Sequence, residues 1–179
     1  IYDRDTSATA DDRVVNGLNA LGHEQAKLVG ARLAALPIKF DRLISSEFLR
    51  AAMTADDMGT AMKMKPTRDG ALNGCTPTTN NARMNSEQEP GELSQCDSAC
   101  PVQWTRYFAP TPDHDTFDVL VCHGNVIRWT LMKATGADAK NWLNLDGGNC
   151  SLTIVAMRPD GTTRLVMYSD VGHMPTDKQ

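Results

Sequence analysis

The sequence predicts an α/β fold with three layers, in which a mainly parallel sheet carries helices on both faces and a C-terminal hairpin adds antiparallel strands. Two observations predict this class. Short apolar runs lead directly into helical patterns twice, over residues 40–64 and 117–136, as is typical of parallel strands covered by helices. The stretch 151–168 then alternates apolar and polar residues around a Pro-Asp-Gly turn, which is typical of a β-hairpin.

The N-terminal part is predicted to begin with an amphipathic helix. Asn19 is a suitable N-cap, and Ala26, Val29 and Leu33 follow at helical spacing before Pro37 ends the pattern. Because 179 residues are enough for one substantial core and too few for two ordinary ones, we expect a single domain over residues 1–179.

The middle of the chain predicts a strand, a helix and a long loop. The apolar run at 40–44 meets two serines and then a helical pattern over about 47–64. From 74 to 92 the chain is rich in Thr, Asn, Pro, Ser and Glu without periodicity, which predicts an excursion over the surface. A short helix is expected at about 102–108.

The strongest strand signal is FDVLVCH at residues 117–123, which we expect to be a central strand covered on both faces. A helix should start at Gly124 and end at Gly136, which is suited to a C-cap. The alternating run 151–168 then supplies the closing hairpin.

Composition limits the classes of partner and location. A net charge of −4 without a basic stripe argues against nucleic acid as a partner. No apolar run approaches the roughly 20 residues that span a bilayer, so we expect no membrane partner for the visible chain. The N-terminus has no secretory signal pattern, and we expect a cytoplasmic protein, leaving open an upstream targeting or anchor segment and an oligomeric state.

Five cysteines, an odd number, favour reduced thiols, and Cys122 lies in an apolar run where it can serve as a small buried side chain. Cys96 and Cys100 leave open a disulfide or a pair of metal ligands. No second Cys or His pair has the spacing that would complete a zinc site. We therefore expect no metal and no cofactor.

Two segments bring polar groups to the places where predicted strands end. In SSEFLRAAMTAD, Arg50 lies one turn into the helix after the strand, and in VCHGNVIR, His123 ends the strand and Gly124 opens the next helix. Ligands bind at the carboxyl ends of parallel strands, helix N-termini attract phosphate, and Arg matches phosphate oxygens. Alone, His123 or Arg50 would be an ordinary structural or solvated residue, but together with Gly124 they predict a phosphate pocket.

Four segments in order resemble the histidine phosphatase superfamily, also called phosphoglycerate mutase-like: LNALGHEQA, SSEFLRAAMTA, VCHGNVIR and GGNCSLTIV. They resemble its LTxxGxxQA, SSxxxRAxxTA, second-histidine and late NGS or NCS motifs, over nearly the whole chain. Within the superfamily, the strongest resemblance is to the mitochondrial Ser/Thr protein phosphatase branch, including the tail SDVGHMPTDK.

The resemblance implies a phosphatase that works without metal and through a phosphohistidine intermediate. The nucleophile of the family lies in an RHG motif, which is not in this sequence and which the family pattern would place, with its first strand, upstream of Ile1. By position, Arg50 would bind the phosphoryl oxygens, His123 would stabilise their developing charge, and Gly124 would offer a backbone contact. The substrate would be a phosphorylated small molecule or a phosphoprotein.

The proton donor is where the resemblance fails. The family has a Glu where this chain has Gly74, so either a loop carboxylate replaces it or protonation of the leaving group is weak. A phosphoglycerate mutase-type transfer and a non-catalytic phosphate-binding scaffold remain as alternative functions. The loop carboxylates considered as replacements are Asp69, Glu87, Glu89 and Glu92.

Overall fold

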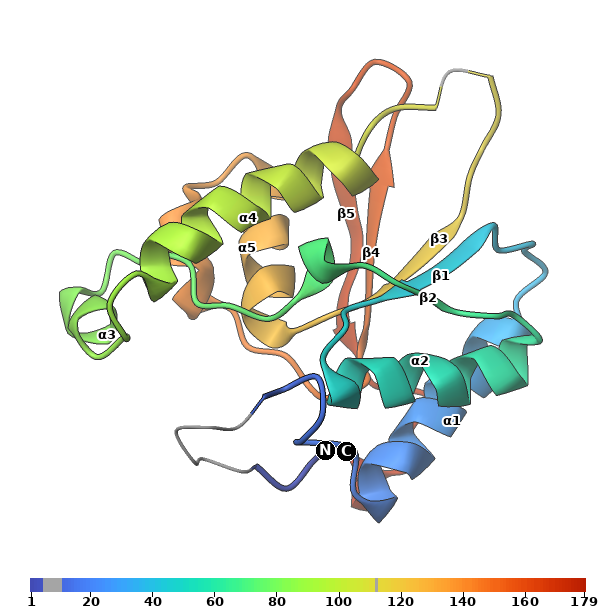
Figure 1. The fold of residues 1–179 in the computed structure, drawn as a ribbon. Coiled ribbons are helices and arrows are strands. Elements are labelled where there is room, and N and C mark those ends of the chain that lie inside the picture. The colour runs from blue at the N-terminus through green and yellow to red at the C-terminus, as the bar shows by residue number, and fades with distance from the viewer. Residues whose placement is uncertain (5–10, 112) are drawn as a thin grey trace.

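A computed structural model describes residues 1–4, 11–111 and 113–179 (Figure 1). Residues 5–10, in the polar N-terminal stretch, and residue 112, in the loop predicted before the central strand, lie outside the described residues. In chain order the elements are α1 (Ala20–Ala34), β1 (Arg42–Ser45), α2 (Leu49–Met62), β2 (Thr67–Arg68), the 3₁₀ turn η1 (Gly70–Leu72), α3 (Ala82–Ser86), α4 (Glu92–Tyr107), β3 (Asp118–Val121), α5 (Gly124–Thr135), η2 (Ala139–Asn144), β4 (Leu152–Met157), β5 (Thr163–Asp170) and η3 (Thr176–Lys178).

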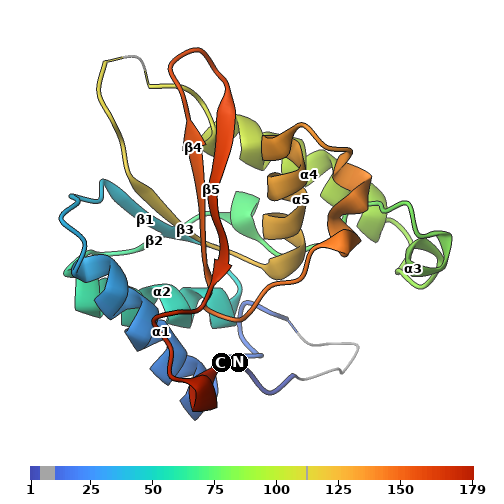
Figure 2. The same ribbon diagram turned by 180° about the vertical axis from the view of Figure 1, so that it is seen from behind.

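The predicted α/β class is confirmed. Three parallel strands form one sheet in the order β2-β1-β3, and β4 and β5 form an antiparallel pair. Helices α1 and α2 lie on one side of the parallel strands, and α4 and α5 lie on the other (Figures 1 and 2). The core beneath α1 and α2 contains Val29, Leu33, Leu43 and Met58. No helix in the described part of the chain is both long and apolar enough to cross a membrane.

Helix α1 begins as predicted, because Asn19 Oδ1 accepts a hydrogen bond from the Gly22 N–H at 3.0 Å. A Cβ at Gly22 would lie 2.1 Å from the carbonyl oxygen of Ile1, so the close crossing of the N-terminal segment requires glycine. The buried Gln25 accepts from the Ile1 ammonium and donates to the Lys178 carbonyl. These contacts explain the conspicuous Gly and Gln of LNALGHEQA and bring the two ends of the chain together (Figure 2).

The strand expected at the centre of the sheet lies at an edge of it. Among the described strands, β1 pairs with both neighbours, whereas β3 pairs only with β1. All four β3 residues are half-buried, and Leu43 and Ile44 of β1 are buried. An apolar run predicts burial of a strand but does not specify its neighbours, and the prediction of a central strand was wrong for this reason.

The structure has more helix between residues 74 and 108 than the predicted loop at 74–92 and helix at 102–108. The loop contains α3, and α4 begins at Glu92, ten residues before the expected helix. The first half of α4 is polar except on one face, and Pro101 lies inside the helix, so the periodic signal was weak. The residues of α4 that are buried are Cys96, Cys100 and Gln103.

Helix α5 and the C-terminal hairpin agree with the sequence prediction. Helix α5 ends at Gly136, whose φ of 73° is the left-handed conformation that glycine adopts without strain. Strands β4 and β5 form the predicted hairpin. Gly161, in the turn that joins these two strands, has a φ of 81°.

A disulfide joins Cys75, in the loop after η1, to Cys96 in α4. The expectation of reduced thiols is therefore wrong at this position. The sequence drew attention to Cys96 and Cys100, which lie one turn apart, but it gave no indication that residue 75 lies against α4. Cys100, Cys122 and Cys150 are free.

Candidate phosphate-binding site

Parallel strands β1 and β3 deliver two helices to one edge of the sheet. β1 leads through two buried serines into α2, and β3 leads through His123 into α5. Since parallel strands end at the same edge, the N-termini of α2 and α5 lie on that side (Figure 1). This is the arrangement predicted for Arg50, His123 and Gly124.

Phe48, the N-cap residue of α2, contacts both Arg50 and His123. The Arg50 guanidinium carbon is 5.1 Å from the centre of the Phe48 ring, and the His123 ring meets the same ring edge-on at 5.2 Å. Arg50 also lies 4.9 Å from the centre of the Tyr2 ring. Neither aromatic residue is predicted from the sequence as part of the site, although Phe48 lies within the SSEFLRA segment.

Asp12 is a carboxylate in the site that the sequence analysis did not identify. Its Oδ1 lies 3.0 Å from Nη1 of the largely buried Arg50. Nη1 is buried and forms no hydrogen bond of acceptable geometry with any described residue, so its hydrogen-bonding capacity is not used in this structure. Asn16 donates to Asp12 Oδ1, and the Asp12 carbonyl accepts from the Leu49 N–H. Asp12 is thus fixed beside the cation by two further contacts.

A chain of hydrogen bonds determines which nitrogen of neutral His123 carries the proton. The Glu47 N–H donates to Asn73 Oδ1, which identifies that atom as the oxygen, and the Ser46 hydroxyl donates to the same oxygen at 2.8 Å. The single hydroxyl hydrogen of Ser46 is then committed, so His123 Nε2, 2.9 Å from Ser46 Oγ, must be the donor. Neutral His123 therefore carries its proton on Nε2 and leaves Nδ1 as the acceptor.

Burial lowers the pKa of His123 to about 4, with a further decrease from the nearby Arg50 and a smaller opposing effect of Asp12. The imidazole is neutral at pH 7 in this state. A bound anion would stabilise the protonated form and raise this pKa. The site can therefore take up a proton together with an anionic ligand.

The N-terminus of α5 adds backbone donors. His123 is the N-cap residue, but its side chain makes no capping hydrogen bond, which leaves the first N–H groups of α5 for an external acceptor. Gly124 is exposed, and a Cβ there would meet only Arg128 Nη2, at 4.0 Å. The position is open to a ligand.

Gly74 packs directly on His123. A Cβ at residue 74 would lie 2.8 Å from His123 Cγ, closer than side chains approach one another. The space that a side chain at residue 74 would need is thus filled by the imidazole ring.

The loop carboxylates considered as proton donors have other partners or positions. Asp69 accepts from Arg106 and Tyr107, both at 2.5 Å; burial raises the pKa of Asp69, but these hydrogen bonds outweigh it and lower the pKa. Glu87 pairs with Arg83 on α3, which lies at the periphery of the molecule (Figure 1). Glu89 is exposed, and Glu92 is the first residue of α4.

Comparison with known proteins identifies what this fold and site resemble. The model of the histidine phosphatase superfamily (branch 1) matches residues 11–88 and 103–170. The mitochondrial serine/threonine-protein phosphatase Pgam5 of Caenorhabditis elegans is 33% identical over 175 residues, covering 93% of this chain and 61% of the relative. Human PGAM5 is 30% identical over 167 residues, covering 90% and 57%. The chain thus spans about 60% of the length of these curated relatives.

Solved structures of similar fold include phosphoglycerate mutase from Plasmodium falciparum, with a TM-score of 0.66, 22% identity and coverage of 88% of this chain and 89% of that one. The mycobacterial glucosyl-3-phosphoglycerate phosphatase Rv2419c has a TM-score of 0.64, 18% identity and coverage of 94% and 93%. At these identities the likeness shows the fold alone.

The relatives correct one expectation. Both Pgam5 proteins are named as mitochondrial, which contradicts the cytoplasmic location expected from the sequence. That expectation rested on cysteine content and on the lack of a secretory signal pattern. Neither property distinguishes the cytoplasm from an organelle, and the prediction of a cytoplasmic location was wrong for this reason.

Proposed function

Because this chain belongs to the histidine phosphatase superfamily, we propose that residues 1–179 form one catalytic domain of a phosphatase that hydrolyses phosphomonoesters through a phosphohistidine intermediate. The observation that carries the proposal is the convergence of Arg50, His123 and the uncapped N-terminus of α5 around Phe48. A fixed cation, a protonatable imidazole and free backbone N–H groups together suit a phosphoryl group.

Each group has a distinct role in the proposed reaction. Arg50 holds two phosphoryl oxygens through its planar guanidinium. His123 is held in position by its hydrogen bond with Ser46. It gains a proton as the anion binds and stabilises the charge that develops in the transition state. Gly124 allows close approach to the N–H groups of α5. These positive groups take the place of a divalent cation, so the reaction needs no metal.

The nucleophile is a histidine outside residues 1–179, in the RHG motif that the family resemblance places upstream. The histidines of this chain are otherwise engaged or exposed: His23 contacts Asp57, His173 contacts Arg32, His123 contacts Ser46, and His114 is exposed in a loop. A phosphoryl group trapped on the full-length protein should map to none of them. Phosphorylation of any of the four would contradict the assignment.

The substrate class follows from the relatives rather than from the pocket. The Pgam5 relatives are named as serine/threonine-protein phosphatases, so we propose a phosphoprotein substrate, with phosphorylated small molecules as the second class. Hydrolysis of phosphoserine or phosphothreonine peptides by the full-length protein, measured against sugar phosphates and phosphoglycerates, separates the two.

The decisive experiment replaces Arg50 and His123 in the full-length protein. Arg50→Ala and His123→Ala should each lower kcat/KM for an aryl phosphate by at least about 100-fold, since loss of one preorganised charge stabiliser costs about 2.7–4 kcal/mol. Arg83→Ala is the matched control, because Arg83 is exposed on the peripheral α3. A decrease in kcat/KM of less than threefold for both variants would contradict the assignment of Arg50 and His123 to the active site.

A non-catalytic phosphate-binding protein is the second candidate, favoured by Gly74 in the place of the family's acid. It predicts tight binding of phosphate or vanadate to the full-length protein without turnover of any phosphomonoester. Turnover that persists in EDTA supports the metal-independent phosphatase instead. Activity that is lost in EDTA and restored by a divalent metal would contradict metal independence.

A further inference from the structure

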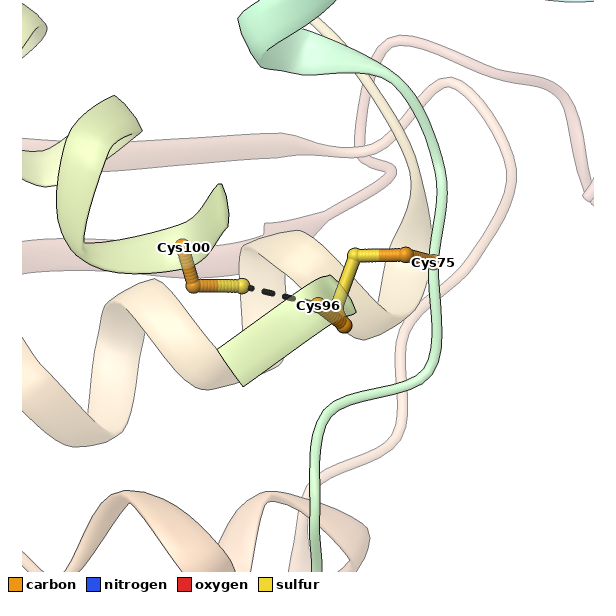
Figure 3. A group of neighbouring side chains, drawn as sticks. All are labelled: Cys75, Cys96 and Cys100. Carbon is orange, nitrogen blue, oxygen red and sulfur yellow. Dashed lines mark hydrogen bonds between the residues drawn. A yellow bond between two sulfur atoms is a disulfide. The ribbon is translucent and has the colours of Figure 1, made fainter. Parts of the chain in front are cut away.

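Three cysteine sulfurs converge at the residue that follows Gly74, the glycine that packs on His123. Cys96 and Cys100 come from successive turns of α4, and Cys75 comes from the loop that runs beside it (Figure 3). The Sγ atoms of all three lie within 4.8 Å of one another, and those of Cys96 and Cys100 are 3.6 Å apart. The Cys75–Cys96 disulfide accounts for two of the sulfurs and leaves the third, a buried thiol, without a role.

The surroundings of this cysteine cluster (Cys75, Cys96 and Cys100) are apolar. Cys96 and Cys100 are buried with Trp129 and Trp142 in one core cluster. Burial, with a contribution from Asp97, raises the pKa of the Cys100 thiol to about 12. Without a ligand, this thiol therefore stays protonated at pH 7 and is a poor nucleophile toward the adjacent disulfide.

Hydrogen bonds hold the loop against α4 and η2 in addition to the disulfide. The backbone N–H and hydroxyl of Thr78 donate to the Asp97 carboxylate at 2.9 and 2.5 Å. The Trp142 indole donates to the Pro77 carbonyl at 3.1 Å. These bonds lie just C-terminal to Cys75, and they do not depend on the disulfide for their donors or acceptors.

We propose that, once the Cys75–Cys96 disulfide is reduced, Cys75, Cys96 and Cys100 form a three-thiolate site for one thiophilic divalent cation, for which Zn²⁺ is the probe. Thiolates are the ligands that soft and borderline cations prefer. With Zn–S bonds of about 2.3 Å, tetrahedral sulfurs lie about 3.8 Å apart, close to the separation of Cys96 and Cys100. A water molecule on the side of the half-buried Cys75 completes four ligands.

The chemistry balances with a dithiol as the reductant. The dithiol supplies two electrons and two protons, becomes a disulfide itself, and leaves Cys75 and Cys96 as thiols. The cation then displaces three protons from the three thiols and binds the three thiolates, which leaves one net negative charge. The disulfide and the cation exclude each other, and the affinity rises with pH because protons are released.

This inference assigns Cys75 a place that the sequence analysis did not give it. A zinc site was discounted because Cys96 and Cys100 lacked a further pair of ligands at a regular spacing. The third sulfur comes instead from a residue 21 positions before Cys96, which only the fold brings into contact. The site also does not depend on the proposed phosphatase activity, and its test measures metal binding alone.

The test uses the reduced full-length protein and titrates Zn²⁺ in competition with a chromophoric chelator. We expect one bound Zn²⁺ per chain, and binding at least about 100-fold weaker in the disulfide-bonded protein and in Cys75→Ser and Cys100→Ser, since even supporting residues of metal ligands contribute 10- to 100-fold. Cys150→Ser is the matched control, because Cys150 belongs to the core beside α1, and it should bind as the unaltered protein does.

A second measurement needs no variant. In the reduced protein, Zn²⁺ should protect Cys75, Cys96 and Cys100 from alkylation and leave Cys150 unprotected, as mapped by mass spectrometry. Co²⁺ in place of Zn²⁺ should show thiolate-to-cobalt charge-transfer absorption. Absence of stoichiometric Zn²⁺ binding to the reduced protein, undiminished binding in Cys100→Ser, or protection confined to other residues would overturn the proposal.

Discussion

The proposed phosphate site and the cysteine cluster meet at Gly74 and Cys75, two consecutive residues, and are held together by different kinds of interaction. Gly74 packs on the His123 ring, whereas Cys75 is bonded to α4. The phosphate site depends on directed interactions, such as the bond from His123 to Ser46. The cysteine cluster depends on apolar packing around Trp129 and Trp142 and on one covalent bond.

The difference predicts that the two regions respond separately. Thr78 and Pro77 have their own partners on α4 and η2, and Asn125 donates one hydrogen bond of 3.3 Å to the Cys75 carbonyl. Among the bonds of the described residues, this one joins the start of α5 to the residue that carries the disulfide. A perturbation on one side should therefore be weakly transmitted to the other, which the following changes test.

Reduction of the disulfide should have the largest effect, and that effect should be on stability. The bond closes a loop between residues 21 positions apart, and a cross-link of this span contributes about 3 kcal/mol to the free energy of unfolding. Urea unfolding with a dithiol and a chelator present measures the loss. Phosphate affinity should change by less than threefold, and a larger change would show that the two regions are coupled.

Gly74→Ala should weaken phosphate binding and leave the disulfide intact, the opposite of what reduction should do. The added Cβ would lie 2.8 Å from His123 Cγ and would displace the ring, at a cost of roughly 1–3 kcal/mol. We expect phosphate affinity to fall by at least about tenfold on the same grounds, while mass spectrometry still finds the Cys75–Cys96 disulfide. Gly147→Ala is the control, because a Cβ there meets only ordinary contacts. Unchanged phosphate affinity in Gly74→Ala would contradict the ring placement.

Sulfate binding should strengthen as the pH falls, since sulfate stays a dianion while His123 gains a proton. The free pKa is about 4 and the bound pKa must be higher, so between the two values affinity should rise up to about tenfold per pH unit. Calorimetry from pH 7 to 5 measures this slope, and His123→Gln should flatten it. A slope unchanged in His123→Gln would assign the proton to another group.

A fall in pH should strengthen sulfate binding through His123 but lower the free energy of unfolding. The unfolded histidine, with a pKa near 6.5, binds more protons than folded His123 at about 4, so this group destabilises the fold progressively as the pH falls from 6.5 to 4. Circular dichroism at each pH confirms that the sulfate titrations are made on folded protein.

Asp12→Asn should have the smallest effect. It removes a carboxylate that lies 3.0 Å from Arg50, and a partly exposed ion pair of this kind is worth about 0.2–1 kcal/mol. Phosphate affinity should rise up to about fivefold on that scale, measured by calorimetry, with Asp11→Asn as the neighbouring control. Weaker phosphate binding in Asp12→Asn would show that the carboxylate supports Arg50 rather than competing with the anion.

The fold was predictable where local pattern and function coincide. Asn19, Gly136 and the turn at Gly161 determined element ends from their own chemistry. Arg50 and His123 could be named as candidates because Arg50 lies in the first turn of the helix that follows β1 and His123 lies two residues after β3. Asp12 and Tyr2 could not be, since they come from a stretch without periodicity and reach the site only through the folding of the chain. For the same reason Cys75 could not be paired with α4.

Pro101 shows a further limit of sequence patterns. Proline usually predicts a break in a helix, yet α4 continues through it. Burial of Cys96, Cys100 and Gln103 on one face holds the helix together, and this tertiary contribution is invisible in the local sequence.

The placement of the tryptophans has an optical consequence. The chain has three: Trp129 and Trp142 lie in the cysteine cluster's core, and Trp104 packs against it. Disulfides quench indole emission by contact, so intrinsic fluorescence should brighten when the Cys75–Cys96 bond is reduced. No indole contacts Phe48 or His123 among the ring contacts described, so the emission of the unlabelled protein should report mainly on the cysteine cluster.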